Sequence, residues 1–205
     1  MRQAAKSPDT FPQQVYMVLT QAFAEVQRAV ALEGYQLYQQ RRYPGEETGR
    51  EMAFDVAIER RGPGQEVLAW LWVWSCIDCA EPVSADDIHA FCAAFNQVNA
   101  EQVKGGIATT GVLTPDALQA AGSQGVCVVR LMPAERVKPL LYRPVYQVGI
   151  HNAEQAEQRR RRQAERALTD AAFTSIAQEL FAMSSRHYFS DLKSLFTYEL
   201  APTPG

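Results

Sequence analysis

The chain has 205 residues, of which 47% are hydrophobic and 21% are charged, a composition typical of a water-soluble globular protein. Its 20 lysines and arginines stand against 23 aspartates and glutamates, and this net charge of -3 gives no support to non-specific nucleic-acid binding. No apolar run reaches the roughly 18 residues that a membrane span needs, and the N-terminal stretch lacks the apolar core of a secretion signal. We therefore expect a cytoplasmic protein with no membrane partner.

The first half of the chain predicts one helix and a hairpin of strands. Apolar residues recur at helical spacing from Phe11 to Glu33, and residues 35–40 favour a short strand. Residues 51–60 alternate between apolar and polar or small side chains, which is the two-residue period of a strand with two unlike faces. After a Gly-Pro-Gly turn, residues 66–76 are apolar on both faces, as is typical of a central strand. We expect the last two strands to pair as a hairpin.

The middle of the chain predicts a strand, helix, strand unit. Residues 83–101 form an amphipathic pattern, with Ser84 as the candidate cap of a helix. A strand at 105–112, a short helix that begins at Thr114 and a strand at 126–131 follow. Because such a unit implies a parallel pair of strands with a right-handed crossover, the sequence predicts an α/β fold.

The last third of the chain predicts helices only. Residues 151–170 are polar all round, and the pattern continues with an apolar stripe from Leu168 to Met183. Further apolar residues at helical spacing follow at 188–200. We expect a domain at 1–150, a C-terminal helical extension at 151–200 and a disordered tail at 201–205.

The polar helix carries a run of four arginines: Arg159, Arg160, Arg161 and Arg162. A charge run is usually a solvated face, and three glutamates of the same segment balance this one. A half-polar helix that extends from a small domain commonly packs on a second chain. We therefore expect a protein partner or a homo-oligomer, with nucleic acid as the alternative ligand of the run.

One segment carries a recognisable pattern. The stretch KGGIATTGVLTPDA, residues 104–117, follows a predicted helix and precedes a helix and a last strand. In this order and pattern, residues 83–131 resemble the second half of the Mrr-type restriction endonuclease domain, a member of the PD-(D/E)XK nuclease superfamily. The resemblance extends over roughly residues 15–142 when the first helix, the short strand and the hairpin are included. It implies a restriction-endonuclease-like mixed central sheet flanked by helices.

The resemblance also implies where a metal site would lie. In that family an acidic residue in the hairpin and a Glu/Gln-x-Lys pair on the next strand bind Mg²⁺ and position the attacking water. Asp55 falls at the place of the acidic residue, whereas Trp72 and Trp74 hold the places of the pair; a shift of two would use Trp70 and Trp72. Indole offers neither a hard oxygen ligand nor a cation. The implied site is degenerate, with Asp55 as a remnant, and we expect no cofactor unless the protein is active with Mg²⁺.

Two roles are open for the tryptophans. Aromatic side chains at alternate strand positions bury large areas against a covering helix, which favours a core role. An aromatic surface in the former cleft would instead receive an unstacked base, a small planar ligand or a side chain of a partner. Trp72 and Trp74 are therefore candidate binding residues.

Three functions follow from the resemblance. The first is a nucleic-acid-binding pseudonuclease, which needs its basic residues to converge on one face: Lys104, Arg41, Arg42, Arg60, Arg61 and the arginine run. The second is a pseudonuclease that binds a protein partner through the tryptophan strand and the C-terminal helices. The third is an active metal-dependent DNA endonuclease whose rearranged site uses another carboxylate, such as Glu25, Glu59 or Asp78.

The cysteines suggest one further site. Cys76, Cys79, His89 and Cys92 have the donor types of a tetrahedral zinc site, although their spacing matches no well-defined zinc motif. Cys92 also falls on the apolar stripe of its predicted helix, and His89 lies beside that stripe. The alternative is a buried thiol and a surface histidine.

Overall fold

The computed structural model describes residues 10–29, 32–46, 49–62, 68–79, 81–131, 137–138, 153–170, 175–176, 180–184, 187–189 and 191–200. These form five helices, namely α1 (Phe11–Ala29), α2 (Ala85–Phe95), α3 (Pro115–Gln124), α4 (Ala153–Thr169) and α5 (Leu192–Leu200). The first five strands are β1 (Tyr35–Pro44), β2 (Glu51–Arg61), β3 (Leu68–Ile77), β4 (Val103–Thr109) and β5 (Cys127–Leu131). The others are β6 (Val137–Lys138), β7 (Ser175–Ile176), β8 (Leu180–Ser184) and β9 (His187–Phe189).

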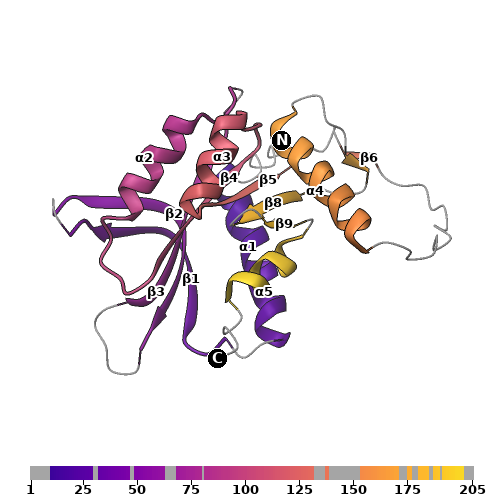
Figure 1. Cartoon of the computed structure of the whole chain (residues 1–205). Coiled ribbons are helices and arrows are strands. Elements are labelled where there is room, and N and C mark those ends of the chain that lie inside the picture. Colours follow the sequence, from indigo (N-terminus) through magenta and orange to yellow (C-terminus); the bar gives the residue numbers. More distant parts are fainter. Residues whose placement is uncertain are drawn as a thin grey trace, which may run out of the picture.

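Seven of the described strands form one mixed sheet in the order β1-β2-β3-β4-β5-β8-β9 (Figure 1). The first three strands are antiparallel, β3, β4 and β5 are parallel, and β8 and β9 return to antiparallel pairing. The helices α2 and α3 connect the parallel strands. The predicted α/β class is confirmed, as is the predicted hairpin, which is formed by β2 and β3.

Local sequence signals explain where α2 and α3 begin. Ser84 caps α2 in a capping box, because its hydroxyl accepts from the N–H of Asp87 while the Asp87 carboxylate accepts from the N–H of Ser84. Thr114 caps α3, because its hydroxyl accepts from the N–H of Ala117, and Pro115 lies in the first turn. Gly125 ends α3 at a φ of 68°, a conformation that favours glycine.

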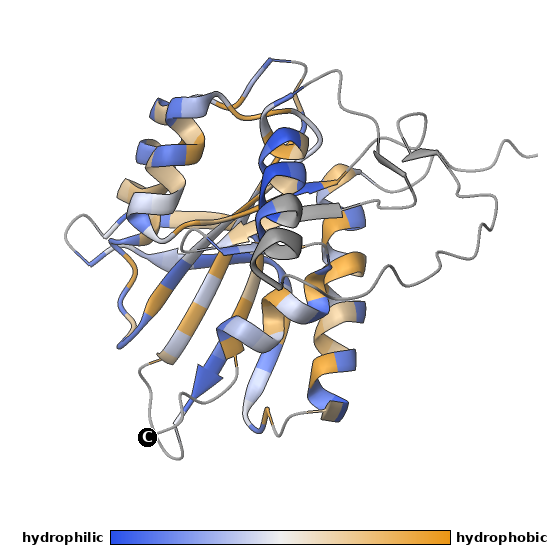
Figure 2. Cartoon of the chain, turned by 45° about the vertical axis from the view of Figure 1, so that its right-hand side comes forward, coloured by the Kyte–Doolittle hydropathy of each residue, from blue (hydrophilic) through white to orange (hydrophobic). Residues whose placement is uncertain are grey.

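The helices lie on both sides of the sheet. Helices α1 and α5 cover one face, which we call the α1/α5 face, and α2, α3 and α4 cover the other, the α2/α3 face (Figure 1). Each face has its own hydrophobic core. In Figure 2 the ribbon of α2 is hydrophilic on its outer side and hydrophobic on the side next to the sheet, where Ile88, Phe91, Cys92 and Phe95 are buried. None of the described helices is long and apolar enough to cross a membrane.

The prediction of a continuous helix through Met183 is wrong. Helix α4 ends at Thr169, and residues 180–184 form the strand β8, which pairs with β5. Within β8, Ala182 packs in the core of the α1/α5 face and Met183 in the core of the α2/α3 face. Pairing with β8 gives hydrogen-bond partners to the backbone N–H and C=O groups along the free edge of β5. An apolar run that fits a helical stripe also fits a strand that is buried on both faces. The segment after residue 150 thus contributes β8 and β9 to the central sheet.

Candidate functional site

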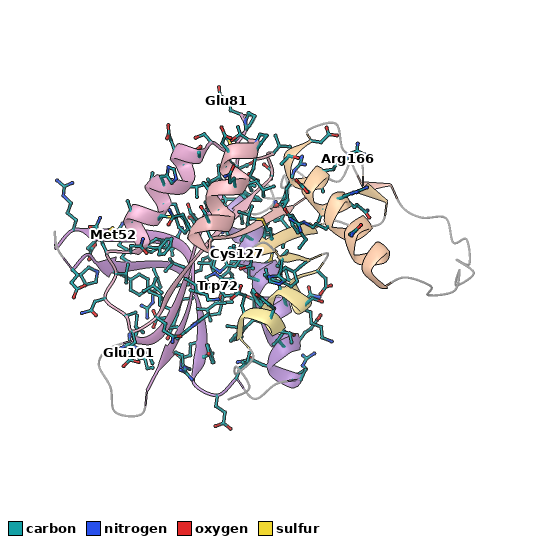
Figure 3. All side chains as sticks on the ribbon, viewed as in Figure 1. Met52, Trp72, Glu81, Glu101, Cys127 and Arg166 are labelled. Atoms are coloured by element: carbon teal, nitrogen blue, oxygen red, sulfur yellow. The ribbon has the colours of Figure 1, made fainter. Side chains whose placement is uncertain are left out.

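The tryptophans of β3 form a buried stack on the α1/α5 face. Trp72 and Trp74 are both 0% exposed, and Trp70 is 5% exposed. The ring of Trp72 lies 4.9 Å from that of Trp74 and 5.3 Å from that of Phe196 on α5, measured between centroids. Figure 3 shows Trp72 in the interior, close to α5. Both rings are core side chains, and neither presents a surface to a ligand.

The two glycines that follow Lys104 are explained by this packing. A Cβ atom at Gly106 would lie 2.5 Å from the Trp74 ring, and a Cβ atom at Gly105 would lie 2.4 Å from the Phe95 ring on the opposite face. Both distances are far below van der Waals contact. The glycines therefore let β4 carry an indole on one side and a helix on the other.

Asp55 lies where β2 separates from β3. The pairing of β2 with β3 runs from Arg61 to Val56, and the next bond is made by a side chain: the Asp55 carboxylate accepts from the backbone N–H of Cys76 at 2.7 Å. A strand N–H points toward its neighbour in the sheet, so the carboxylate lies between the strands. On the neighbouring strand β1, Gln40 lies opposite Asp55 and has a φ of 51°. The alternation of side chains between the two faces is therefore interrupted at this point of β1 and β2.

The contact to Asp55 also affects the thiol of Cys76. Burial raises the pKa of this thiol well above its usual value, and the neighbouring Asp55 carboxylate raises it further by charge repulsion and hydrogen bonding. The thiol therefore stays protonated at neutral pH, which makes it a poor nucleophile and a poor metal ligand.

A carboxylate that sequence reasoning missed lies beside the tryptophans. Glu199 of α5, whose side chain is 1% exposed, forms an ion pair with Lys104 of β4 and accepts a hydrogen bond from the hydroxyl of Ser184. Lys104 pairs with Trp72 across β3 and β4. The sequence feature that points to Glu199 is its position on the apolar stripe of α5, where a buried charged residue needs a partner.

Asp55 and the Lys104–Glu199 pair do not converge. Asp55 contacts Cys76, whereas Lys104 is the neighbour of Trp72. Four residues along a strand separate those two β3 positions by about 13 Å. The carboxylate ligands of one Mg²⁺ ion must each come within about 2.0–2.1 Å of it, whereas the Asp55 and Glu199 carboxylates are bound to groups that lie apart along the sheet.

The other candidate carboxylates are also apart. Glu25 is exposed on α1, and Asp78 accepts a hydrogen bond from the hydroxyl of Thr110. Glu59 lies on the α2/α3 face, where Tyr43 donates to it at 2.7 Å. Within the described part of the chain, no three His, Cys, Asp or Glu side chains are grouped closely enough to hold a metal ion.

The structure does not bring the four candidate zinc ligands together. Cys76 packs against the core of the α1/α5 face, whereas Cys92 is buried in the core of the α2/α3 face. His89 is exposed on α2, and the Cys79 thiol donates to the carbonyl of Glu81 at 3.0 Å. The sheet itself separates Cys76 from Cys92.

Two arginines of the paired strands β1 and β2, Arg41 and Arg61, contact Glu59. This side chain is only 3% exposed, and it lies 3.3 Å from Nε of Arg41 and 3.5 Å from a terminal nitrogen of Arg61. Arg42 follows on β1 and pairs with the exposed Glu51. Burial raises the pKa of the Tyr43 hydroxyl, and its hydrogen bond to Glu59 raises it further, so Tyr43 remains a donor.

The basic residues do not converge on one face. The hairpin cluster lies at the edge of the sheet formed by β1, whereas Arg161 of α4 lies over the ring of Tyr188 on β9, at the opposite edge. Figure 3 shows the same separation between Met52 of the hairpin and Arg166 of α4. Arg60 is on the α1/α5 side over the ring of Tyr35. Arg162 is exposed, and the side chains of Arg159 and Arg160 lie outside the described residues.

The apolar stripe predicted for a partner packs, where it is described, on the chain itself. Leu168 and Met183 are buried in the core of the α2/α3 face. Leu195 and Phe196 of α5 are buried in the core of the α1/α5 face. An interface through these side chains would require them to leave their own core.

Fold and site together define an α/β protein with a tryptophan core on one face of its sheet and, on the other, a buried glutamate that holds two arginines. No protein-family model matches the chain, and no curated protein matches it. Among solved structures, it is similar to the crystal structure of a protein of unknown function, AF1548, with a TM-score of 0.40 and 18% sequence identity. The alignment covers 58% of this chain and 57% of that one, so the chain spans little more than half of that protein's length.

Substitution of Asp55 tests its contact with β3. We expect Asp55→Ala to lower the free energy of unfolding by about 1–2 kcal/mol, because the N–H of Cys76 loses its acceptor. Asp55→Asn keeps an acceptor oxygen and is expected to cost less. Urea denaturation measures both values, with Asp78→Ala as the control at an exposed carboxylate. Equal stability of Asp55→Ala and the wild type would exclude this role.

Proposed function

We propose that the chain is an Mrr-like pseudonuclease, a protein of restriction-endonuclease-like fold that binds nucleic acid without cleaving it. The observation that carries the proposal is the complete burial of Trp72 and Trp74 at the strand positions where the resemblance expects the Glu/Gln-x-Lys pair. Hydrolysis of a phosphodiester needs oxygen ligands for the metal and a cation near the developing negative charge. Two fully buried indoles under a helix supply neither.

The basic residues do not converge into the broad face that extensive nucleic-acid binding needs, but the hairpin arginines alone support a short contact with nucleic acid. Arg42 and Arg61 have side chains that are 70% and 52% exposed, and Arg41 beside them is 41% exposed. Guanidinium groups bind phosphate oxygens in a bidentate geometry that lysine cannot match. Because the other basic residues lie elsewhere, the proposed contact is short and involves about three phosphates at most.

The proposal predicts binding without cleavage. With Mg²⁺ or Mn²⁺ present, we expect no cleavage of DNA or RNA above the background of a mock purification. Binding of duplex DNA should weaken with salt along a slope of about -3 or shallower in log K against log salt, since each phosphate contact contributes about -0.9. Gel assays of cleavage and fluorescence anisotropy at several salt concentrations measure the two quantities.

The opposite result would promote the alternative function. Metal-dependent cleavage that disappears in Asp55→Ala, with the fold intact by circular dichroism, would identify an active endonuclease with a rearranged site. A slope much steeper than -3 would require further basic residues at the interface. A protein partner or homo-oligomer would need a surface other than the described part of the apolar stripe, which is buried in the chain's own core.

A further inference from the structure

Tyr38 and Arg41 form a stacked pair on the edge strand β1. The guanidinium carbon of Arg41 lies 4.1 Å from the centroid of the Tyr38 ring, which is the geometry of a cation–π contact. The Tyr38 hydroxyl donates to the side-chain carbonyl of Gln36, which lies two residues earlier on the same face of β1. The ring is therefore oriented by two contacts, one at its hydroxyl and one on its face.

The irregularity at Gln40 brings these two side chains to one face of the sheet. Tyr38 is opposite Ala57 and Arg41 is opposite Phe54, and both partners belong to the core of the α2/α3 face. In a regular strand, residues three positions apart point to opposite faces. The φ of 51° at Gln40 breaks this alternation, and a residue other than glycine rarely adopts this conformation. The stacked pair thus depends on an uncommon backbone conformation.

The pair lies on a part of the sheet that the described helices leave open. Helix α1 packs against β1 from the α1/α5 face, whereas α2 and α3 on the other face pack against β4 and β5. In Figure 1, β1 runs beyond the lower ends of α2 and α3. Tyr38 is half-buried, and the side chain of Arg41 is 41% exposed. A ligand therefore reaches the pair without a change in the fold.

The charges around the pair are positive but few. Arg61 of β2 flanks it with a side chain that is 52% exposed, and both Arg41 and Arg61 contact the buried carboxylate of Glu59. Two guanidinium groups against one carboxylate leave one positive charge. Arg42 is next to Arg41 along β1, so it points to the other face, where it pairs with Glu51. Contacts with backbone phosphates alone would therefore be weak here.

An unpaired base gains more from this surface than a phosphate does. Bases stack on aromatic rings and on guanidinium planes, and this stacking is tolerant of sequence because every base has such a face. In a duplex the bases stack on one another and their faces are covered, whereas in a single strand they can be splayed out. A stacked tyrosine and arginine with one net positive charge therefore fit a single strand better than a duplex.

We propose that this strip of β1 and β2 is a binding surface for single-stranded nucleic acid, with one base stacked on the Tyr38–Arg41 pair and an adjoining phosphate on Arg61. A guanidinium has five N–H donors, so Arg61 keeps donors for a phosphate beside its contact with Glu59 at 3.5 Å. The inference rests on the proposed function and specifies its ligand, because it assigns the tighter binding to strands with accessible bases.

The test compares one labelled DNA strand with the same strand in a duplex. A strand of about 12 nucleotides is long enough for a small binding surface. We expect the full chain to bind the single strand at least about fivefold more tightly than the duplex, because it gains the stacking of one base. Fluorescence anisotropy at one fixed salt concentration measures both dissociation constants.

The variants separate the ring of Tyr38 from its hydroxyl and its bulk. Tyr38→Ala should abolish the preference for the single strand, and Tyr38→Leu, which keeps bulk without an aromatic face, should do the same. Tyr38→Phe keeps the ring and should retain the preference. The matched control is Tyr198→Ala, because Tyr198 is 47% exposed on α5 and contacts Phe189 at the opposite edge of the sheet. Circular dichroism checks that each variant is folded.

Each outcome separates the two proposals. Equal binding of single strand and duplex, or a preference that survives both Tyr38→Ala and Tyr38→Leu, overturns the single-strand surface and leaves nucleic-acid binding intact. A preference that is lost in Tyr38→Phe or in Tyr198→Ala also overturns it, because stacking on Tyr38 needs neither the hydroxyl nor Tyr198. If the chain binds neither the single strand nor the duplex, both proposals are overturned.

Discussion

Trp72→Ala is expected to lower the free energy of unfolding by about 3–5 kcal/mol. Trp72 is 0% exposed and touches Trp70, Trp74 and Phe196, so its removal leaves a cavity that surrounding rings cannot close. Trp72→Phe should cost less, since it keeps a ring and also removes the indole N–H, which has no acceptor among the described residues.

Urea denaturation followed by circular dichroism measures these values, with Met17→Ala on the exposed side of α1 as the control. A cost below about 1 kcal/mol for Trp72→Ala would show that the stack is not a rigid core.

The same site permits a more demanding test, in which Trp72→Glu is combined with Trp74→Lys. Two charged groups would then enter a space shaped for rings, and we expect the fold to be lost before any cleavage appears. A folded and cutting double variant would contradict both the packing and the proposed loss of activity.

Lys104→Met is expected to destabilise the fold by about 3–5 kcal/mol, because it leaves the buried carboxylate of Glu199 without its counter-charge. The hydroxyl of Ser184 would remain as a donor, but a neutral donor does not replace a cation. Glu199→Gln should cost less, since the side chain of Lys104 is 39% exposed and can be hydrated. The two substitutions combined should recover much of the loss.

A double-mutant cycle in urea measures the coupling between Lys104 and Glu199. The matched control is Arg166→Met, which breaks the exposed pair with Asp170 at 3.4 Å and should cost less than about 1 kcal/mol. If Lys104→Met costs no more than Arg166→Met, then α5 does not rely on this ion pair. In that case the buried apolar side chains of α5 hold the helix on the sheet, namely Leu192, Leu195, Phe196 and Leu200.

Elements with local signals were predictable from the sequence. The caps at Ser84 and Thr114 and the alternation in residues 51–60 depend on neighbours within a few positions, and the structure has α2, α3 and β2 there. The segment 180–184 was not predictable in this way, because its apolar residues fit both periods. Its choice of strand depends on pairing with β5, about fifty residues earlier in the chain.

The candidate site was predictable only in part. That the tryptophans share one face follows from their alternate positions, but their cover by α5 depends on a helix more than 110 residues away. Lys104 and Glu199 are 95 residues apart, and no local pattern links them. The place of Asp55 depends on where β2 leaves β3, which a regular alternation does not reveal. Long-range contacts and a local irregularity thus account for what sequence reasoning missed.

The tryptophan stack also determines which part of the protein its intrinsic tryptophan fluorescence reports on. All three tryptophans of the chain belong to the core between the sheet and α1 and α5. Indole emission therefore originates from one side of the molecule, and the core under α2 and α3 contributes none of it. Detachment of α5 alone would expose Trp72, which contacts Phe196, and would change its emission while most of the sheet stayed folded. Comparison of this emission with far-ultraviolet circular dichroism would reveal such a partial opening as two transitions that do not coincide.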